Sequence, residues 1–220
     1  MLRTLATLVG AAAVYGFAVG SVHSGTYALR NLAKFPLLIL ATGGLCAVSY
    51  YLFSQFFTRR LAWSDVQRLA FRTFRDTALL LASLGPVFLF LAHTIDQPDE
   101  TSLNEYPLFL ALNVAAIALC GCLALVHQAL ALVRRYGLGI RRSVLITVTW
   151  LALSLFVGGQ CAWYLRPFCG ISTIPADDVP FCMGTSPHVS GARSFYEAVY
   201  HILKPPPLRR GYWRMYRGKS

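Results

Sequence analysis

The chain has 220 residues, of which 56% are hydrophobic and 13% are charged, and its formal net charge at pH 7 is +11. Soluble domains carry about 25% charged residues, so this composition excludes an ordinary soluble protein and indicates one that crosses a membrane. In a soluble domain the positive charge would point to nucleic acid. Here the basic residues stand in short runs beside apolar segments, where they can meet anionic lipid headgroups.

Five apolar segments are long enough for helices that cross the hydrocarbon layer, which takes about 20 residues. We predict spans at residues 4–22, 35–58, 77–95, 106–133 and 144–165. The first segment follows a single basic residue, Arg3, and a cleaved signal peptide is the alternative. Its apolar run continues through Val19 without a clean small-x-small cleavage site, which favours a retained helix.

The segment from Leu61 to Asp76 differs from the spans, because its apolar residues are interleaved with three arginines and two aspartates. Ser64 and Asp65 are typical of a helix start. We predict an interfacial amphipathic helix at residues 61–76, lying in the headgroup plane. Contact with a calmodulin-like protein or with nucleic acid is the alternative. In the third span, Gly85-Pro86 predicts a kink.

The fourth span contains several polar residues and thiols, namely Asn113, Cys120, Cys122, His127 and Gln128. A histidine within a span is a candidate for haem, quinone or a proton relay. His127 lies near Arg134-Arg135, however, where interfacial water can satisfy it, and thiols in an apolar helix usually pack as small hydrophobes. The loop at residues 96–105 holds four acidic residues without the regular spacing of a calcium loop, which indicates a solvated turn.

The end of the fifth span carries a concentrated group of polar and aromatic residues: Gln160, Trp163, Arg166, Pro167 and Phe168. An arginine between an apolar helix and a proline is expected at the outer interface, where it reaches lipid phosphate or the carbonyls of the following loop. We predict a structural or interaction role for this group.

Residues 166–220 form an extramembrane segment in our prediction, after a helix bundle at residues 1–165. Cys169 and Cys182 lie outside the apolar segments, and we predict a disulfide between them. A metal site with His188 is the alternative, but it lacks a fourth ligand and a Cys-x-x-Cys pair. The basic, aromatic tail predicts contact with anionic lipid headgroups or with an acidic partner. Its contact residues are Arg209, Arg210, Tyr212, Trp213, Arg214, Tyr216 and Arg217.

Lysine and arginine collect in two of the predicted loops, the one between spans two and three and the one between spans four and five. The positive-inside rule therefore places the N-terminus in the cytoplasm and the C-terminal segment outside. The basic tail opposes this orientation, but a C-terminal tail has less influence than internal loops. The expected location is the plasma (inner) membrane, with several spans.

Two short motifs support a family resemblance: Lys34-Phe35-Pro36-Leu37-Leu38-x-Leu40 at the second span, and Gln160-x-x-Trp163-x-Leu165-Arg166-Pro167-Phe168 at the end of the fifth. With five spans, the chain resembles uncharacterised bacterial membrane proteins related to the Yip-type (Ypt-interacting) membrane family. The resemblance implies a five-helix bundle without catalytic residues.

The fold class predicted is all-α, a polytopic membrane protein built as a bundle of about five transmembrane helices. No nucleophile–base pair, metal cluster or phosphate loop appears in the sequence, so we predict no enzyme, no cofactor and no metal. We expect a membrane scaffold or an accessory subunit of a membrane complex. Its helices would pack on lipid or on other membrane subunits through Gly43-Gly44, Gly121 and Gly158-Gly159.

The alternative function is a small transporter or lipid-handling protein. Its polar path would be lined by Asn113, His127, Gln160 and Arg166. No aspartate or glutamate lies inside a predicted span, which disfavours proton coupling.

Overall fold

The computed structural model describes residues 2–22, 24–94, 105–166, 168, 181–182 and 194–196. These contain five α-helices and no strand. The helices are α1 (Leu2–Gly20), α2 (Gly25–Phe57), α3 (Trp63–Thr94), α4 (Glu105–Tyr136) and α5 (Ile140–Leu165). All five are long and apolar enough to cross a membrane. The prediction of an all-α, multi-pass membrane protein is therefore confirmed.

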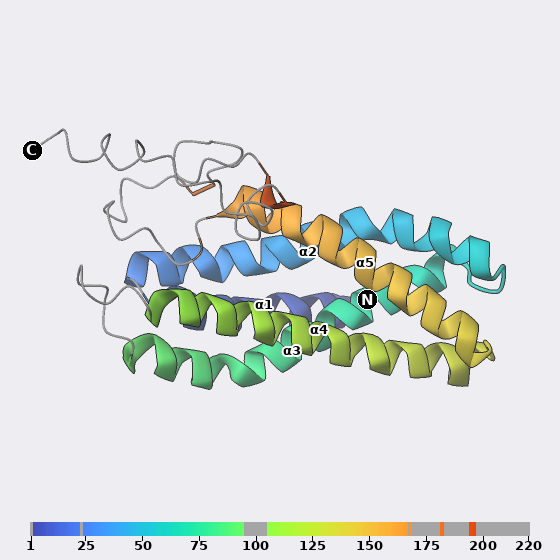
Figure 1. The fold of residues 1–220 in the computed structure, drawn as a ribbon, viewed down its shortest axis with the longest axis horizontal. Coiled ribbons are helices and arrows are strands. Elements are labelled where there is room, and N and C mark those ends of the chain that lie inside the picture. The colour runs from blue at the N-terminus through green and yellow to red at the C-terminus, as the bar shows by residue number, and fades with distance from the viewer. Residues whose placement is uncertain are drawn as a thin grey trace, which may run out of the picture.

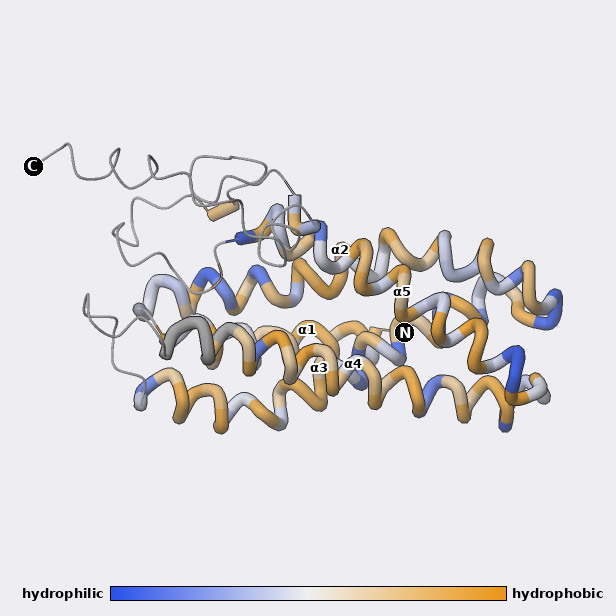
Figure 2. The backbone as a smooth tube through the Cα atoms, in the orientation of Figure 1, coloured by the Kyte–Doolittle hydropathy of each residue, from blue (hydrophilic) through white to orange (hydrophobic). Residues whose placement is uncertain are grey.

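The helices run roughly along one axis and form an elongated bundle (Figure 1). α1 packs against α2 and α3, α2 also packs against α5, and α4 packs against α3 and α5. The helices α2 to α4 follow most of the length of the bundle, whereas α1 begins about halfway along it (Figure 1). Hydrophobic residues cover most of each helix, and hydrophilic ones gather at the α2–α3 and α4–α5 turns (Figure 2). Large apolar side chains such as Phe56, which is 83% exposed, face outward.

Residues 63–76 are helical but do not form a separate interfacial helix. They are the first half of α3, which continues without interruption through the third span and past Pro86. No glycine or proline separates the two halves before Gly85, and the first half buries Val66, Leu69 and Ala70 in the bundle. Packing therefore keeps this amphipathic segment aligned with the span, and the separation that we predicted is wrong.

The second helix begins ten residues earlier than the predicted span. Ser24 is its N-cap, and the Ser24 hydroxyl accepts a hydrogen bond from the backbone N–H of Tyr27 at 3.4 Å. This early start places Lys34 and Pro36 inside α2 and not at its entry. The predicted span began directly after Lys34, whereas the capping hydroxyl of Ser24 marks the start of the helix in the structure.

Two clusters of aromatic residues lie in different halves of the bundle. In the first, Tyr15 contacts Phe35 and Phe88 edge-on, each with 5.4 Å between ring centroids. In the second, Tyr50 and Trp150 are stacked at 4.6 Å, and Trp150 Nε1 donates to Ser54 Oγ at 3.2 Å. These contacts join α1 to α2 and α3 in one half, and α2 to α5 in the other.

Two glycines of α1 bring it unusually close to α2. A Cβ atom on Gly16 would lie 2.4 Å from the carbonyl oxygen of Asn31, and one on Gly20 would lie 2.6 Å from that of Tyr27. The spacing Gly16-x-x-x-Gly20 is the small-residue motif of close helix pairs. We did not select it from the sequence. Of the glycines that we did select, Gly44 and Gly121 have no neighbouring atom within 4 Å of such a Cβ.

Candidate functional site

The group predicted at the end of α5 is partly brought together. The guanidinium carbon of Arg166 lies 3.6 Å from the centroid of the Trp163 ring, a close cation–π contact. Desolvation lowers the pKa of Arg166, but arginine stays charged at neutral pH. Gln160 is half-buried, about one turn before Trp163. Pro167 lies outside the described residues.

Phe168 connects the end of α5 to the first turns of α2. Asn31 Nδ2 donates a hydrogen bond to the carbonyl oxygen of Phe168, and the Phe168 ring contacts Phe35 edge-on at 5.3 Å. Lys34 is fully buried, with its Nζ atom 5.8 Å from the Phe168 centroid and 5.0 Å from that of Phe181. The chain that follows α5 therefore covers a lysine that stands one position before the second predicted span.

A second segment after α5 packs back on this helix. The Tyr196 ring is stacked on Phe156 with 5.0 Å between centroids, and the Tyr196 hydroxyl donates to the Phe156 carbonyl oxygen. Burial raises the pKa of Tyr196. Phe195 fills the space next to Gly159. These contacts hold part of the C-terminal segment against the helix.

Asn113 and His127, two of the four residues proposed for a polar path, lie in different surroundings. Asn113 is buried, and its Oδ1 atom accepts a hydrogen bond from the Tyr15 hydroxyl at 2.6 Å. The His127 side chain is 74% exposed. A buried side chain and an exposed one do not line the same interior path, which weighs against a path shared by these two residues.

His127 instead contacts a carboxylate of the neighbouring helix. Its Nδ1 atom lies 3.4 Å from Asp76 Oδ2, and Asp76 also pairs with Arg75 at 2.5 Å. Asp76 lies in α3, between the amphipathic half and the apolar half. Asp76 lies outside the predicted spans and His127 lies inside one, so the sequence gives no reason to pair them.

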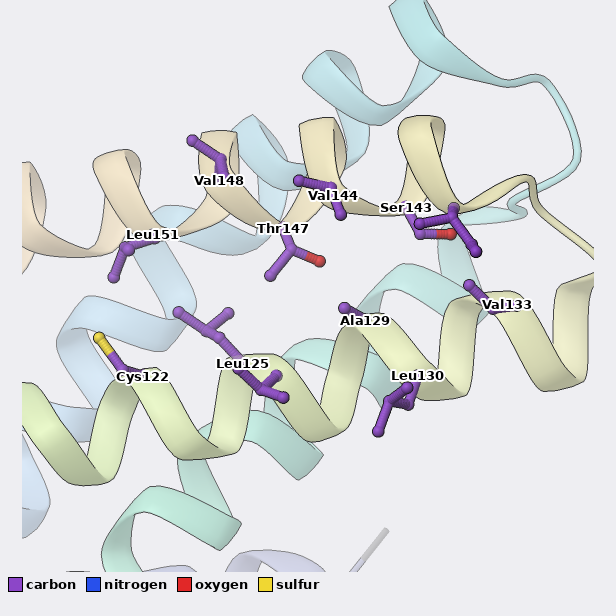
Figure 3. A pocket seen from close by; sticks show the side chains of 12 residues that line it. Cys122, Leu125, Ala129, Leu130, Val133, Ser143, Val144, Thr147, Val148 and Leu151 are labelled. Atoms are coloured by element: carbon purple, nitrogen blue, oxygen red, sulfur yellow. The ribbon is translucent and has the colours of Figure 1, made fainter.

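A groove of about 490 Å³ lies between α4 and α5 (Figure 3). Its walls are almost entirely apolar, and Ser143 and Thr147 of α5 are the hydroxyl residues in it. Figure 3 shows Thr147 between the two helices, opposite Ala129 of α4. The complete lining is Cys122, Leu125, Val126, Ala129, Leu130, Val133, Ile140, Ser143, Val144, Thr147, Val148 and Leu151.

The two hydroxyls of the groove are buried without a hydrogen-bond partner. This holds for Ser143 Oγ and Thr147 Oγ1 among the described residues, and Ser143 is 1% exposed. Leaving such a group unpaired costs about 1–3 kcal/mol. The sequence shows a serine and a threonine one turn apart in an apolar helix, but not the groove itself, which forms where α5 packs beside α4.

The predicted Cys169–Cys182 disulfide is not seen. Cys182 is exposed and has a free thiol, and Cys169 lies outside the described residues. His188 and the basic tail, residues 208–220, lie outside them as well. In the described part of the chain, no three histidine, cysteine, aspartate or glutamate side chains are grouped to hold a metal ion.

Comparison of the chain with protein-family models, with curated proteins and with solved structures finds no match. The resemblance to the Yip-type membrane family therefore stays a prediction.

Proposed function

We propose that this protein is a non-catalytic scaffold or accessory subunit of a membrane complex, and that the α4–α5 groove binds a transmembrane helix of the partner subunit. The observation that carries the proposal is the pair of buried hydroxyls in that groove, Ser143 and Thr147, without partners among the described residues.

A partner helix explains these hydroxyls better than a lipid acyl chain does. An acyl chain fills apolar space but has no donor or acceptor, so it leaves both hydroxyls unpaired. The hydroxyl oxygens themselves are covered, so a rotation about χ1 must first turn each of them toward the groove. A helix with a polar side chain can then pair with them, and polar contacts of this kind stabilise transmembrane helix pairs by about 1 kcal/mol. The lining contains no charged residue, which agrees with an apolar helix as the occupant.

The exposure of α5 supports the same proposal. Four of its residues, Ser143, Ile146, Trp150 and Leu165, are buried. Large apolar side chains along it stay exposed, among them Val148 at 56% and Phe156 at 60%. A helix with so little of its surface packed has room for a further neighbour.

Site-specific photo-crosslinking in native membranes tests this function. A photoreactive residue at Val148, in the groove, is compared with one at Val87, which is 52% exposed on α3 and lies outside the groove. We expect one discrete protein adduct from position 148 and none from position 87. Lipid adducts alone at both positions, or the same protein adducts at both, would reject the proposed docking of a subunit in this groove.

We further propose an orientation with a cytoplasmic N-terminus, an external C-terminal segment and a Cys169–Cys182 disulfide in the native membrane. The support is the distribution of basic residues between the loops. A membrane-impermeant thiol reagent is applied to intact cells before and after reduction, with the double variant Cys169→Ser/Cys182→Ser as the unlabelled control. Labelling of Cys182 after reduction alone supports both proposals. Labelling without reductant rejects the disulfide, and no labelling at all rejects the orientation.

A further inference from the structure

A second, basic pocket lies where the start of α1 meets the amphipathic half of α3. It has a volume of about 290 Å³ and lies apart from the α4–α5 groove. Thr4 lines it from α1, and α3 contributes two arginines and three further side chains. The lining residues are Thr4, Ser64, Gln67, Arg68, Phe71 and Arg72.

The polar residues of this pocket carry hydrogen-bond donors, and two of them carry positive charge. Arg68 is held by Asp65, whose Oδ1 atom accepts from Arg68 Nη2 at 2.9 Å, while Arg68 Nε donates to the carbonyl oxygen of Ser64 at 3.2 Å. Arg72 is exposed and makes no ion pair with any residue in the described ranges. The pocket therefore has one arginine that is paired with a carboxylate and a second whose charge is available to a ligand.

Asp65 is the carboxylate next to Arg68 and Arg72, and it already accepts hydrogen bonds from other groups of the chain. It accepts from Arg68 and also from the Tyr136 hydroxyl, at 3.3 Å. With two guanidinium groups against one carboxylate, the pocket retains a net positive charge. Guanidinium groups and hydroxyls together are the donors that bind phosphate oxygens.

The length of α1 gives the depth of the pocket in the membrane. Its 19 residues extend about 28 Å, which is close to the thickness of the hydrocarbon layer. A spanning α1 therefore has Thr4, in its first turn, at the boundary between hydrocarbon and headgroups. The phosphates of the lipid lie at this depth, beside apolar surface such as Leu2, which is 81% exposed.

We propose that this pocket is a binding site for the phosphate headgroup of an anionic phospholipid. Arg72 is the main residue that binds the phosphate, and Arg68 is the second. The lipid is favoured over a soluble phosphate compound because the pocket joins cationic donors to an apolar wall, Phe71, at headgroup depth. The site is independent of the partner-helix groove, which lies between other helices.

Lipid binding to the full-length protein tests the site. The purified protein in detergent is titrated with phosphatidylglycerol or phosphatidylcholine, and bound lipid is counted by native mass spectrometry. Arg72→Gln is compared with Arg135→Gln, which removes an exposed arginine that does not line the pocket. Arg72→Lys tests whether charge alone is sufficient.

We expect the wild-type protein to prefer phosphatidylglycerol, Arg72→Gln to weaken its binding about fivefold, and Arg135→Gln to change it less than twofold. Arg72→Lys should fall between Arg72→Gln and the wild type, because an ammonium keeps the charge but loses the planar fork. Equal effects of Arg72→Gln and Arg135→Gln would overturn the site in favour of diffuse surface charge. Displacement of the lipid by millimolar inorganic phosphate would indicate a site for free phosphate and overturn the lipid assignment.

Discussion

Two of the regions in which polar side chains are buried between helices differ in whether those side chains are hydrogen-bonded. Where α1 meets α4, the Tyr15 hydroxyl donates to Asn113 at 2.6 Å, inside a cluster of aromatic rings. Between α4 and α5, Ser143 and Thr147 have no partner among the described residues and border a groove of about 490 Å³.

The difference separates two roles for polar groups in a membrane protein. The pair of Tyr15 and Asn113 is complete within the chain, so its contribution is to the stability of the fold. The hydroxyls of the groove contribute nothing of this kind to the isolated chain, because a buried unpaired hydroxyl destabilises it. A polar group that is costly alone and useful in a complex is what the proposed accessory subunit requires.

The largest loss of stability is expected where α1 lies against α2. Gly16→Ala places a methyl group 2.4 Å from the Asn31 carbonyl oxygen, so the helices must separate, at a cost of about 2 kcal/mol or more. Gly10→Ala is the control, since no atom lies within 4 Å of its Cβ position, and alanine there favours the helix slightly. Thermal unfolding in detergent measures both. Similar midpoints for the two variants would contradict the close packing.

Removing the hydrogen bond between Tyr15 and Asn113 should cause the next largest loss of stability. Tyr15→Phe removes the hydroxyl and leaves Asn113 Oδ1 buried without this donor, which costs about 1 kcal/mol. Tyr164→Phe is the matched control, because Tyr164 is 52% exposed. The midpoint of thermal unfolding should fall for the first variant and stay unchanged for the second. A midpoint for Tyr15→Phe equal to that of the wild type would remove the contrast between the two regions.

The spans were predictable from the sequence, because about 20 apolar residues are required to cross the membrane whatever their neighbours are. The close approach of α1 was also readable, from Gly16-x-x-x-Gly20 in an apolar segment. Burial of Lys34 was not, since it depends on Phe168 and Phe181, which are more than 130 positions away in the chain. The continuity of α3 was not readable either, because it depends on which face of residues 63–76 packs in the bundle.

The candidate functional site was predictable only where its contacts are local in the sequence. Trp163 and Arg166 are three positions apart in the chain, so the sequence placed them in one group, but we predicted lipid phosphate or loop carbonyls as the partners of Arg166 and not the Trp163 ring. The α4–α5 groove and the pair of Asp76 with His127 depend on how separate helices pack side by side. A hydropathy pattern gives the length of a helix but not the neighbour that its polar residues face.

A substitution in the α4–α5 groove should stabilise the isolated chain, whereas the substitutions at Gly16 and Tyr15 should destabilise it. Ser143→Ala removes a buried hydroxyl without a partner among the described residues, so the isolated protein should become slightly more stable, by up to about 1 kcal/mol. The crosslinked or co-purified partner should at the same time be recovered in lower yield. Ser83→Ala, on an exposed face of α3, should change neither quantity. Lower stability of Ser143→Ala in detergent would mean that its hydroxyl is satisfied within the chain.

The smallest loss of stability is expected at the end of α5, where the contact between Trp163 and Arg166 is local and partly exposed. Arg166→Lys keeps the positive charge but loses the planar group that lies 3.6 Å from the Trp163 ring, so stability should fall by about 0.5–1 kcal/mol. Arg141→Lys replaces an exposed arginine near the other end of the same helix and should have no measurable effect. Thermal unfolding compares them, and the fluorescence of Trp163 reports on the contact itself. If the two lysine variants unfold at the same temperature with unchanged fluorescence, the cation–π contact contributes nothing to the fold, and the arginine there has no stabilising role that lysine cannot fill.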